Sequence, residues 1–320
     1  MQQFVSSAQF NHLHHHSMIL LVRIFPEIAI KSRPVRKRLV QRLCSNIGLA
    51  CHPLDKTIKI KSLWDKIKVS SESTDPKVQQ LVIRKLQQIP GIQDFSIVED
   101  FDFLNSDDLF TKTLLHYQDQ LTDRSFAVRV KRVGIHPFTS LDLEREIGRR
   151  LLETCSNSSV NLTKPDVTVK IEIKDDQFYL YHHYYPGLNG YPIGAQEKVL
   201  SLISGGFDSS VSSFLMMQKG CKVDFLFFNL GGYAHELGVK EVSKYLSSNY
   251  SDGYGSSFIS VNFEPIIAEL MESIDPKYRG LILKRCMLKI AEQLCQVNDY
   301  KAIITGESLG QVSSQTLINL

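Results

Sequence analysis

Short apolar runs alternate with amphipathic helical patterns in the C-terminal part of the chain. Residues 199–203 are mostly apolar, as expected for one buried strand of a parallel sheet. Residues 209–217 then predict a helix that ends at Gly220. Its apolar positions fall on roughly one face: Val211, Phe214, Leu215 and Met217. The alternation continues and predicts a doubly wound parallel sheet, with further strands at 222–228, 257–263 and 302–305 and helices at 237–246, 265–271 and 281–295.

The first third of the chain carries the order strand, helix, strand, strand, helix, strand, which is that of a ferredoxin-like split βαβ fold. The expected strands are 18–25, 57–61, 66–70 and 92–98, and the expected helices are 31–42 and 76–88. Ser32 is suited to cap the first helix, and Pro34 is suited to its first turn. Val35, Leu39 and Leu43 would then face a core.

The middle of the chain mixes the two patterns. We expect helices at 104–121 and 139–152, and strands at 125–132, 167–173 and 177–184. Within 125–132 the side chains alternate, so that Phe126, Val128 and Val130 share one face of the strand. Arg129 and Lys131 fall on the other face.

These elements predict a multidomain protein that combines α/β and α+β folds. Residues 1–17 would lie outside the core, and residues 18–79 would form the ferredoxin-like domain. Residues 80–185 would form a second domain, and residues 186–320 the parallel-sheet domain. The glycine- and proline-rich segment 186–194 reads as a linker into that last domain.

The composition is that of an ordinary soluble protein, with 43% hydrophobic and 22% charged residues. No apolar run approaches the roughly 20 residues that span a bilayer, and the polar start does not resemble a secretory signal. We therefore expect a cytoplasmic protein without membrane contact. Its six cysteines contain no CxxC pair or zinc-type spacing, so we expect packed, reduced thiols. His12, His14, His15 and His16 could bind metal as a tract, or belong to an extended start before Met18.

Positive charge is concentrated near the N-terminus. Residues 18–80 contain 13 Lys and Arg against five Asp and Glu, a balance of +8, whereas the whole chain carries +3. Such asymmetry points to a polyanionic partner. Five cations of the helix at 31–42 would point largely outward: Arg33, Arg36, Lys37, Arg38 and Arg42. They form either a solvated helix face or a stripe that contacts nucleic-acid phosphates.

The loop Ser204–Ser210 joins the first strand of the parallel sheet to the following helix. A small-residue loop that opens a helix is suited to bind an anion, because the first N–H groups of the helix are unpaired. Gly205 and Gly206 would let the backbone approach a phosphate closely. Asp208 is unfavourable beside an anion unless it holds Mg²⁺ or orients a reacting group. The alternative is a plain strand-to-helix turn.

The string Ser204-Gly-Gly-Phe-Asp-Ser209 resembles the SGGxDS signature of the PP-loop ATP pyrophosphatases, which split ATP between its α and β phosphates. Residues 129–140 with 164–169 resemble a THUMP domain, a module associated with tRNA-modifying enzymes. That resemblance implies RNA contact, with a charged solvent face as the alternative, for five cations: Arg129, Lys131, Arg132, Arg149 and Arg150.

The whole arrangement resembles the bacterial tRNA 4-thiouridine synthetases (tRNA uracil 4-sulfurtransferases, the ThiI family), most closely at 200–210, 228–238 and 306–316. The resemblance implies that ATP activates C4 of uridine 8 in tRNA by adenylation, and that persulfide sulfur then displaces AMP to give 4-thiouridine. ATP and Mg²⁺ are the implied cofactors. The implied partners are tRNA and a cysteine desulfurase, and a sulfur carrier, a homodimer and a role in thiamine thiazole synthesis are compatible with it.

The resemblance also assigns roles to individual residues. Asp208 matches the aspartate needed for activation, and no residue is assigned to a resident metal site. The ATP-binding positions are Leu202, Ile203, Ser204, Gly205, Gly206, Ser209, Lys284, Gly306 and Gln315, and Glu307 and Gln311 could orient the last loop. We interpret His235 as structural, and Cys286 and Cys295 as packing residues.

The chain also departs from the family pattern. Family members continue beyond the motif at Gly306 with a further lysine and a sulfur-handling cysteine, and some add a rhodanese-like domain. This chain ends at Leu320, so we expect either a fragment or an enzyme that cannot complete sulfur transfer. The competing readings are another PP-loop tRNA-modifying enzyme and a tRNA-binding protein that does not turn over ATP.

Overall fold

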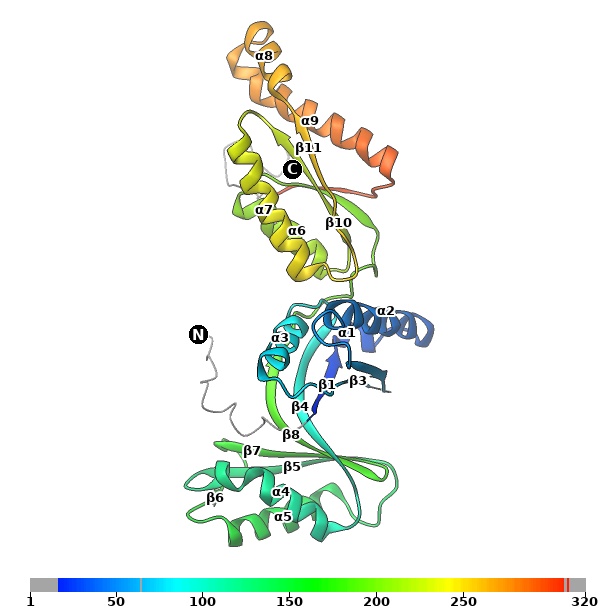
Figure 1. Cartoon of the computed structure of the whole chain (residues 1–320), viewed down its shortest axis with the longest axis vertical. Helices are drawn as coiled ribbons and strands as arrows, with labels where there is room; N and C mark the ends of the chain where they lie inside the picture. The colour runs from blue at the N-terminus through cyan, green and yellow to red at the C-terminus, as the bar shows by residue number, and fades with distance from the viewer. Residues whose placement is uncertain (1–16, 64, 308–309, 311–320) are drawn as a thin grey trace. The chain divides into compact units, whose positions relative to one another are not determined.

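The computed structural model describes residues 17–63, 65–307 and 310, which fall into two compact units (Figure 1). Unit 1 consists of Val22–Phe95 together with the chain from Pro186 onward, and unit 2 consists of Ser17–Leu21 with Ser96–Tyr185. Unit 2 is therefore largely an insertion in unit 1. Strands β4 (Ile92–Asp102) and β8 (Gln177–Pro186) carry the chain into and out of it.

The N-terminal part of unit 1 confirms the ferredoxin-like prediction, because its strands have the order β2-β3-β1-β4. Its elements before β4 are β1 (Met18–Ile24), α1 (Pro26–Ala29), α2 (Arg33–Cys51), β2 (Lys59–Ser62), β3 (Lys66–Ser71) and α3 (Pro76–Gln87). Ser32 is the N-cap residue of α2, as expected, but its side chain makes no capping bond within the described residues. Leu39 and Leu43 are buried, whereas Val35 is only half-buried.

Unit 2 packs two helices on one sheet. The elements are α4 (Ser106–Leu121), β5 (Ser125–Val133), α5 (Ser140–Thr154), β6 (Ser159–Val160) and β7 (Val167–Lys174), with β8 and the end of β4. Strand β5 lies between the parallel strands β6 and β7, and β7 pairs with β8 in antiparallel fashion. The alternation predicted for β5 is confirmed, since Phe126, Val128 and Val130 enter the core. Arg129 and Lys131 are exposed.

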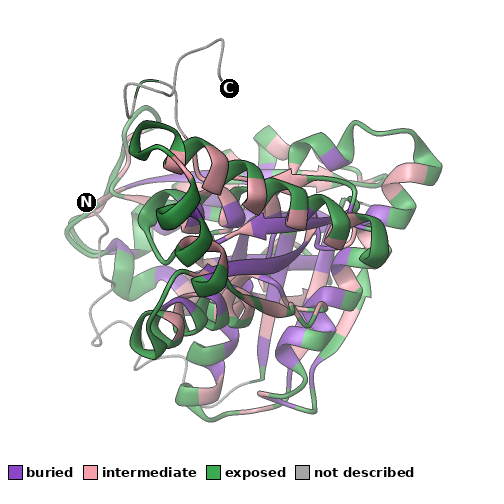
Figure 2. Cartoon of the chain, turned by 90° about the horizontal axis from the view of Figure 1, so that it is seen from above, coloured by how far each residue is buried: buried purple, intermediate pink, exposed green. Residues whose placement is uncertain are grey.

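The C-terminal part of unit 1 is a doubly wound parallel sheet with the order β11-β10-β9-β12. Its elements are β9 (Lys198–Leu202), α6 (Phe207–Gln218), β10 (Lys222–Asn229), α7 (Tyr233–Tyr250), β11 (Phe258–Asn262), α8 (Glu264–Ser273), α9 (Pro276–Asn298) and β12 (Ile303–Ile304). One face of the sheet packs against α6 and α7, and the other against α8 and α9. Figure 2 shows the resulting distribution, with buried strands beneath helices whose outer faces are exposed.

The face predicted for α6 is confirmed in part, since Met217 is buried and Phe214 packs against the core. Val211 and Leu215 are exposed at 52% and 47%, whereas Ser213 is fully buried. The Ser213 hydroxyl lies 2.7 Å from the Ser209 carbonyl oxygen and 2.7 Å from the hydroxyl of Ser201 in β9. Because its hydrogen bonds are satisfied locally, a small polar side chain can line the contact and let α6 lie close to β9.

Unit 1 is also held by contacts between its ferredoxin-like part and the end of α7. Lys85 in α3 lies 2.9 Å from the carboxylate of Asp252 and donates a 2.6 Å hydrogen bond to the Ser248 carbonyl. Gln88 donates to the side chain of Asn249 at 3.2 Å. The two parts of unit 1 are therefore joined by polar contacts between segments far apart in the sequence.

Within the described residues, no helix is both long and apolar enough to cross a membrane. All six cysteines are free, as expected. Burial raises the pKa of the Cys51 thiol to about 12 and also raises the pKa values of Cys221 and Cys295. These thiols therefore stay protonated at neutral pH, which fits a packing role.

One fully buried carboxylate organises the amino-terminal edge of the parallel sheet. Asp224 accepts hydrogen bonds from the hydroxyls of Tyr300, at 2.7 Å, and Tyr254, at 3.0 Å. Its second oxygen lies 3.0 Å from the ammonium of Lys198, and the backbone N–H of Ser257 donates to the first at 2.7 Å. Lys198 starts β9, Tyr254 and Ser257 precede β11, and Tyr300 precedes β12. Asp224 itself belongs to β10, so one side chain connects four strands at this edge.

We expect Asp224→Ala to lower the free energy of unfolding by about 3–5 kcal/mol, because it leaves Lys198 and two tyrosines without their shared acceptor. Urea denaturation followed by circular dichroism measures the change. Asp299→Asn is the matched control, since Asp299 pairs with Lys301 at the surface and its loss should cost less than about 0.5 kcal/mol. Equal effects of the two variants would contradict the structural role of Asp224.

Candidate functional site

The carboxyl ends of β9 and β12 meet at the point where the order of the sheet reverses, which is where doubly wound sheets bind ligands. A cavity of about 280 Å³ opens there. Its lining residues come from the loop after β9, the start of α6, helix α9 and the loop after β12: Leu202, Ser204, Gly206, Asp208, Ser209, Lys284, Met287, Leu288, Thr305, Gly306 and Glu307.

The loop after β9 is built to present the start of α6. Gly205 has a φ of +81°, a left-handed conformation that side chains rarely adopt. Gly206 is the N-cap residue, and among the described residues no side chain caps the helix there. The Ser209 hydroxyl accepts from the Ser204 N–H at 3.2 Å and lies 3.2 Å from the Gly206 carbonyl oxygen. The first N–H groups of α6 and the positive end of its dipole therefore face the cavity, as anion binding requires.

The loop after β12 passes unusually close to the same helix. A Cβ atom built at Gly306 would lie 2.5 Å from the backbone nitrogen of Ser209 and 2.9 Å from the carbonyl carbon of Asp208. Only glycine fits at this distance. The contact fixes one wall of the cavity against the first turn of α6.

Charged side chains line the cavity from three elements. Asp208 belongs to the first turn of α6, and Lys284 of α9 forms an ion pair with Glu307 of the last loop. Both partners of this pair are partly exposed, at 48% and 27% of their side chains. The described lining residues thus offer one cation, two carboxylates and backbone donors, a set suited to a phosphate-rich ligand with a divalent cation.

Most of the predicted nucleotide positions come together in this cavity. Ile203 does not line it, because its side chain is buried in the core on the α6–α7 side of the sheet. Gly205 contributes its backbone turn beside Val239 and does not line the cavity either. Gln311 and Gln315 lie outside the described residues.

Sequence reasoning missed Met287, Leu288 and Thr305. Leu288 follows Lys284 by one helical turn, and that spacing could have identified it.

His235 supports the loop after β9. Its Nε2 lies 3.2 Å from the Ser204 carbonyl oxygen, and its ring packs edge-on against Phe227 at 5.2 Å between centroids. Both contacts belong to the scaffold beneath the cavity. They agree with the structural interpretation of this histidine.

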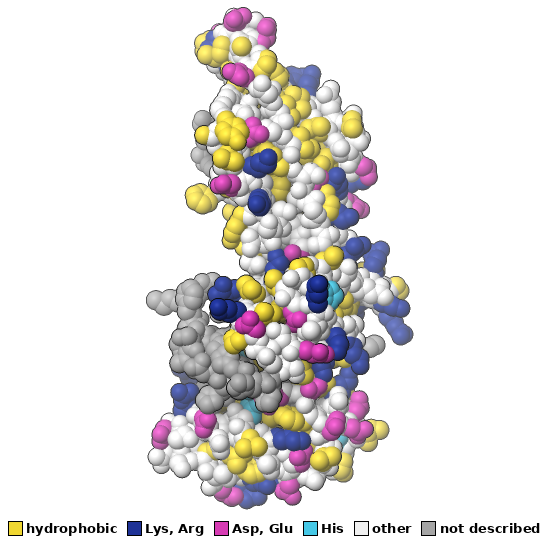
Figure 3. Space-filling model, viewed as in Figure 1, with side chains coloured by type: hydrophobic (Ala, Val, Ile, Leu, Met, Phe, Trp, Pro, Cys, Tyr) yellow, Lys and Arg dark blue, Asp and Glu magenta, His cyan; other side chains and the backbone are white. Residues whose placement is uncertain are grey.

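The basic residues of α2 line a second hollow, a groove of about 480 Å³. Its lining residues are Lys31, Arg33, Arg36, Lys37, Val40, Gln41, Ser62 and Leu63, of which four are cationic and none is acidic. Arg38 is exposed on the same helix but does not line the groove. Figure 3 shows dark blue Lys and Arg side chains gathered on the part of unit 1 that holds α2.

The predicted cations of unit 2 have partners within that unit. Arg129 donates to the Leu162 carbonyl at 2.7 Å, and Lys131 lies 3.7 Å from a Glu172 carboxylate oxygen. Arg132 is half-buried, 3.5 Å from His136. Arg149 pairs with Glu153, and Arg150 with Asp107, at 2.8 Å each. Arg129 and Lys131 nonetheless remain exposed on the sheet surface.

Fold and site together define a PP-loop domain preceded by ferredoxin-like and THUMP domains. Family models match all three parts: a ThiI ferredoxin-like domain at residues 19–96, a THUMP domain at 105–183, and "Thiamine biosynthesis protein (ThiI)" at 194–320. The chain belongs to the ThiI family.

Curated relatives agree with this assignment. The tRNA sulfurtransferases of Shigella dysenteriae serotype 1 (strain Sd197) and Escherichia coli (strain SMS-3-5 / SECEC) are each 46% identical over 304 residues. These matches cover 95% of this chain and 62% of each relative. The chain therefore spans somewhat less than two thirds of the length of the curated relatives it matches.

Solved structures share the fold. A 4-thiouridine synthetase in complex with RNA and bound ATP matches with a TM-score of 0.80 at 24% identity, over 94% of this chain and 76% of that chain. PH1313 from Pyrococcus horikoshii Ot3 matches with a TM-score of 0.71 at 22% identity, over 93% of this chain and 88% of that chain.

We expect Gly306→Ala to destabilise the protein by about 1–3 kcal/mol, since the added methyl group must displace backbone at Ser209. Gly238→Ala is the matched control. Gly238 lies within α7 and has nothing within 4 Å of an added Cβ, so alanine should stabilise the helix by roughly 0.5–1 kcal/mol. Thermal unfolding of both variants compares the two positions, and destabilisation of similar size at both would refute the close-approach argument.

Proposed function

We propose that the cavity at the ends of β9 and β12 binds ATP with Mg²⁺, and that the chain uses it to activate a uridine of tRNA for thiolation. The observation that carries the proposal is the convergence of Asp208, Lys284 and the start of α6, which no described side chain caps, on one cavity at the switch point of the sheet. The names of the curated relatives, tRNA sulfurtransferases, and the ATP and RNA bound by the related 4-thiouridine synthetase support the choice of ligands.

Each group in the cavity has a role in this proposal. The N–H groups of the loop and of the first turn of α6, with the Ser204 and Ser209 hydroxyls, hold the β- and γ-phosphates. The exposed carboxylate of Asp208 suits Mg²⁺, which prefers one or two carboxylates together with phosphate oxygens. Lys284 exchanges its partner Glu307 for the nucleotide, and the apolar side chain of Leu202 packs against the nucleoside.

The proposed reaction transfers AMP from ATP to the C4 oxygen of uridine 8. That oxygen attacks the α-phosphorus, the bond to pyrophosphate breaks, and the uracil N3 proton is lost to solvent. Pyrophosphate remains in the loop before it leaves. A persulfide sulfur then attacks C4 and expels AMP, which leaves a disulfide between C4 and the cysteine of the sulfur donor. A second thiol cleaves this disulfide, forms a new disulfide with the donor cysteine, and leaves 4-thiouridine in the tRNA.

Binding of tRNA is assigned to the cationic surfaces. The groove on α2 carries four positive side chains and no carboxylate among its lining residues, which suits a phosphodiester backbone. Arg38 on α2 and the exposed cations of β5, Arg129 and Lys131, would add further phosphate contacts. Arg132 is assigned here a supporting role through its contact with His136.

The remaining steps of the proposed reaction need partner proteins. The sulfur would come from a cysteine desulfurase, directly or through a sulfur carrier, and the same sulfur could serve thiamine thiazole synthesis. A homodimer is compatible with this scheme. The six free cysteines fit a reducing compartment, and we assign the protein to the cytoplasm on that ground.

We expect Asp208→Ala and Asp208→Asn to abolish tRNA-dependent exchange of pyrophosphate into ATP, while tRNA affinity changes by less than about threefold because a carboxylate does not attract phosphate. Glu241→Ala removes an exposed carboxylate of α7 outside the cavity and should retain exchange. Comparable loss of tRNA binding and exchange would argue against the assigned role. Absence of exchange in the unaltered chain would favour a tRNA-binding protein without turnover.

Reversal of charge at Arg36 and Arg38 should weaken tRNA binding and reduce the slope of log K against log salt by about 2, as two phosphate contacts are lost. The matched control is Lys240→Glu with Lys244→Glu, the same charge change on exposed positions of α7. Filter binding at several salt concentrations gives both slopes. An unchanged slope in the α2 variant would identify this face as merely solvated.

A further inference from the structure

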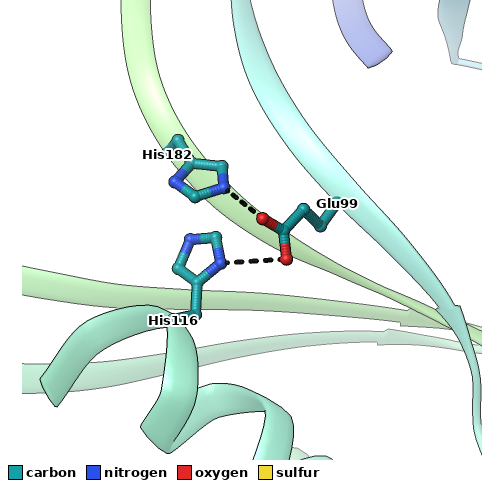
Figure 4. Close-up of side chains that lie close together, drawn as sticks. All are labelled: Glu99, His116 and His182. Carbon is teal, nitrogen blue, oxygen red and sulfur yellow. Dashed lines mark hydrogen bonds and ion pairs between the residues drawn. The ribbon is translucent and has the colours of Figure 1, made fainter. Parts of the chain in front are cut away.

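Two histidines and a glutamate converge inside unit 2, whereas the cavity and the groove belong to unit 1. Glu99 comes from β4, His116 from α4 and His182 from β8 (Figure 4). His182 Nε2 lies 3.1 Å from one Glu99 carboxylate oxygen, and His116 Nδ1 lies 3.3 Å from the other. One donor atom from each residue falls within 4.8 Å of the other two. Three elements thus direct nitrogen and oxygen donors toward a single point.

The cluster contains a buried polar atom that destabilises the folded protein when no ligand is bound. The His116 side chain is only 1% exposed; its Nδ1 pairs with the Glu99 carboxylate, whereas its Nε2 has no hydrogen-bond partner among the described residues. Its ring faces that of His182 at 3.5 Å between centroids, so two imidazoles share one carboxylate. Buried polar atoms are normally satisfied, and an unsatisfied one costs about 1–3 kcal/mol. A ligand that accepts lone pairs from both rings would remove this cost.

We propose that Glu99, His116 and His182 form a binding site for a divalent transition-metal ion, with zinc as the expected occupant. Two imidazole nitrogens and one carboxylate oxygen are a common zinc ligand set, whereas Mg²⁺ and Ca²⁺ prefer oxygen ligands alone. Zinc binds such nitrogens at about 2.0–2.1 Å, so the rings need only turn from the carboxylate toward a shared ion. Water completes the fourth position.

The ion would tie α4 to the two strands through which the chain enters and leaves unit 2. Glu99 and His182 stand 83 positions apart in the sequence, so no local spacing reveals the set. The site shares no residue with the cavity at the ends of β9 and β12 and does not depend on the proposed reaction. Its expected effect is on the stability of unit 2.

The test must remove one competing binder, the histidine tract near the N-terminus. The starting protein is therefore the full chain in which His12, His14, His15 and His16 are replaced by alanine. We expect it to bind one equivalent of Co²⁺ with the visible absorption of a tetrahedral site, and to release that Co²⁺ to Zn²⁺. Zinc should also raise its thermal unfolding midpoint.

Glu99→Gln and His182→Gln in this background should each weaken zinc binding on the order of 100-fold or more, and should abolish the zinc-dependent rise in unfolding temperature. His183→Gln is the matched control, because the next position of β8 faces the other side of the sheet. Circular dichroism without metal checks that each variant is folded. No stoichiometric binding in the starting protein, or equal binding in the His182→Gln and His183→Gln variants, would overturn the proposal and leave a histidine–carboxylate cluster without metal.

Discussion

The cavity at the ends of β9 and β12 depends on one contact, the approach of the Gly306 backbone to the first turn of α6. Parallel strands alone would bring the loops after β9 and β12 to the same edge of the sheet. Here the backbone of the loop after β12 also contacts the backbone of α6, so these two segments form two walls of the cavity. Helix α9 forms the third wall through Lys284 and its neighbours. The two described carboxylate residues of the cavity, Asp208 and Glu307, are each part of this contact or adjacent to it in sequence. Their positions follow from the packing of main chain.

Carboxylates lie in different environments at the two edges of the parallel sheet. At the amino-terminal edge, Asp224 is fully buried and surrounded by hydrogen-bond donors, so its charge stabilises the packing of the strands. At the carboxyl edge, Asp208 is exposed, and Lys284 and Glu307 pair where solvent and ligand can reach them. A carboxylate is therefore buried and structural at one end and exposed at the other. The difference in burial, more than the residue type, separates the two roles.

Much of this architecture could be predicted from the sequence, because long segments with one buried face have a clear period. The elements α1 and β6 are too short to show a period, and they were missed. On α6, the burial of Phe214 and Met217 was predictable, whereas that of Ser213 was not, because serine counts as polar although Ser213 satisfies its hydroxyl locally. The glycine loop was predictable because its residues are contiguous. Met287 and Thr305 were not, since the wall they form exists only after the sheet has brought separate segments together.

Chain order and spatial grouping differ in unit 1, and the difference bears on synthesis. The ferredoxin-like part emerges from the ribosome first, unit 2 follows, and the parallel sheet comes last. At ~5–20 residues per second, the inserted unit delays the partner of Lys85 by on the order of 10 s. The surface at α3 that contacts Asp252 and Asn249 in the folded protein therefore stays exposed to solvent during this time. Because the residues that make these contacts are polar, the exposure does not favour aggregation. A wholly apolar contact at the same place would expose the nascent chain to aggregation for that time.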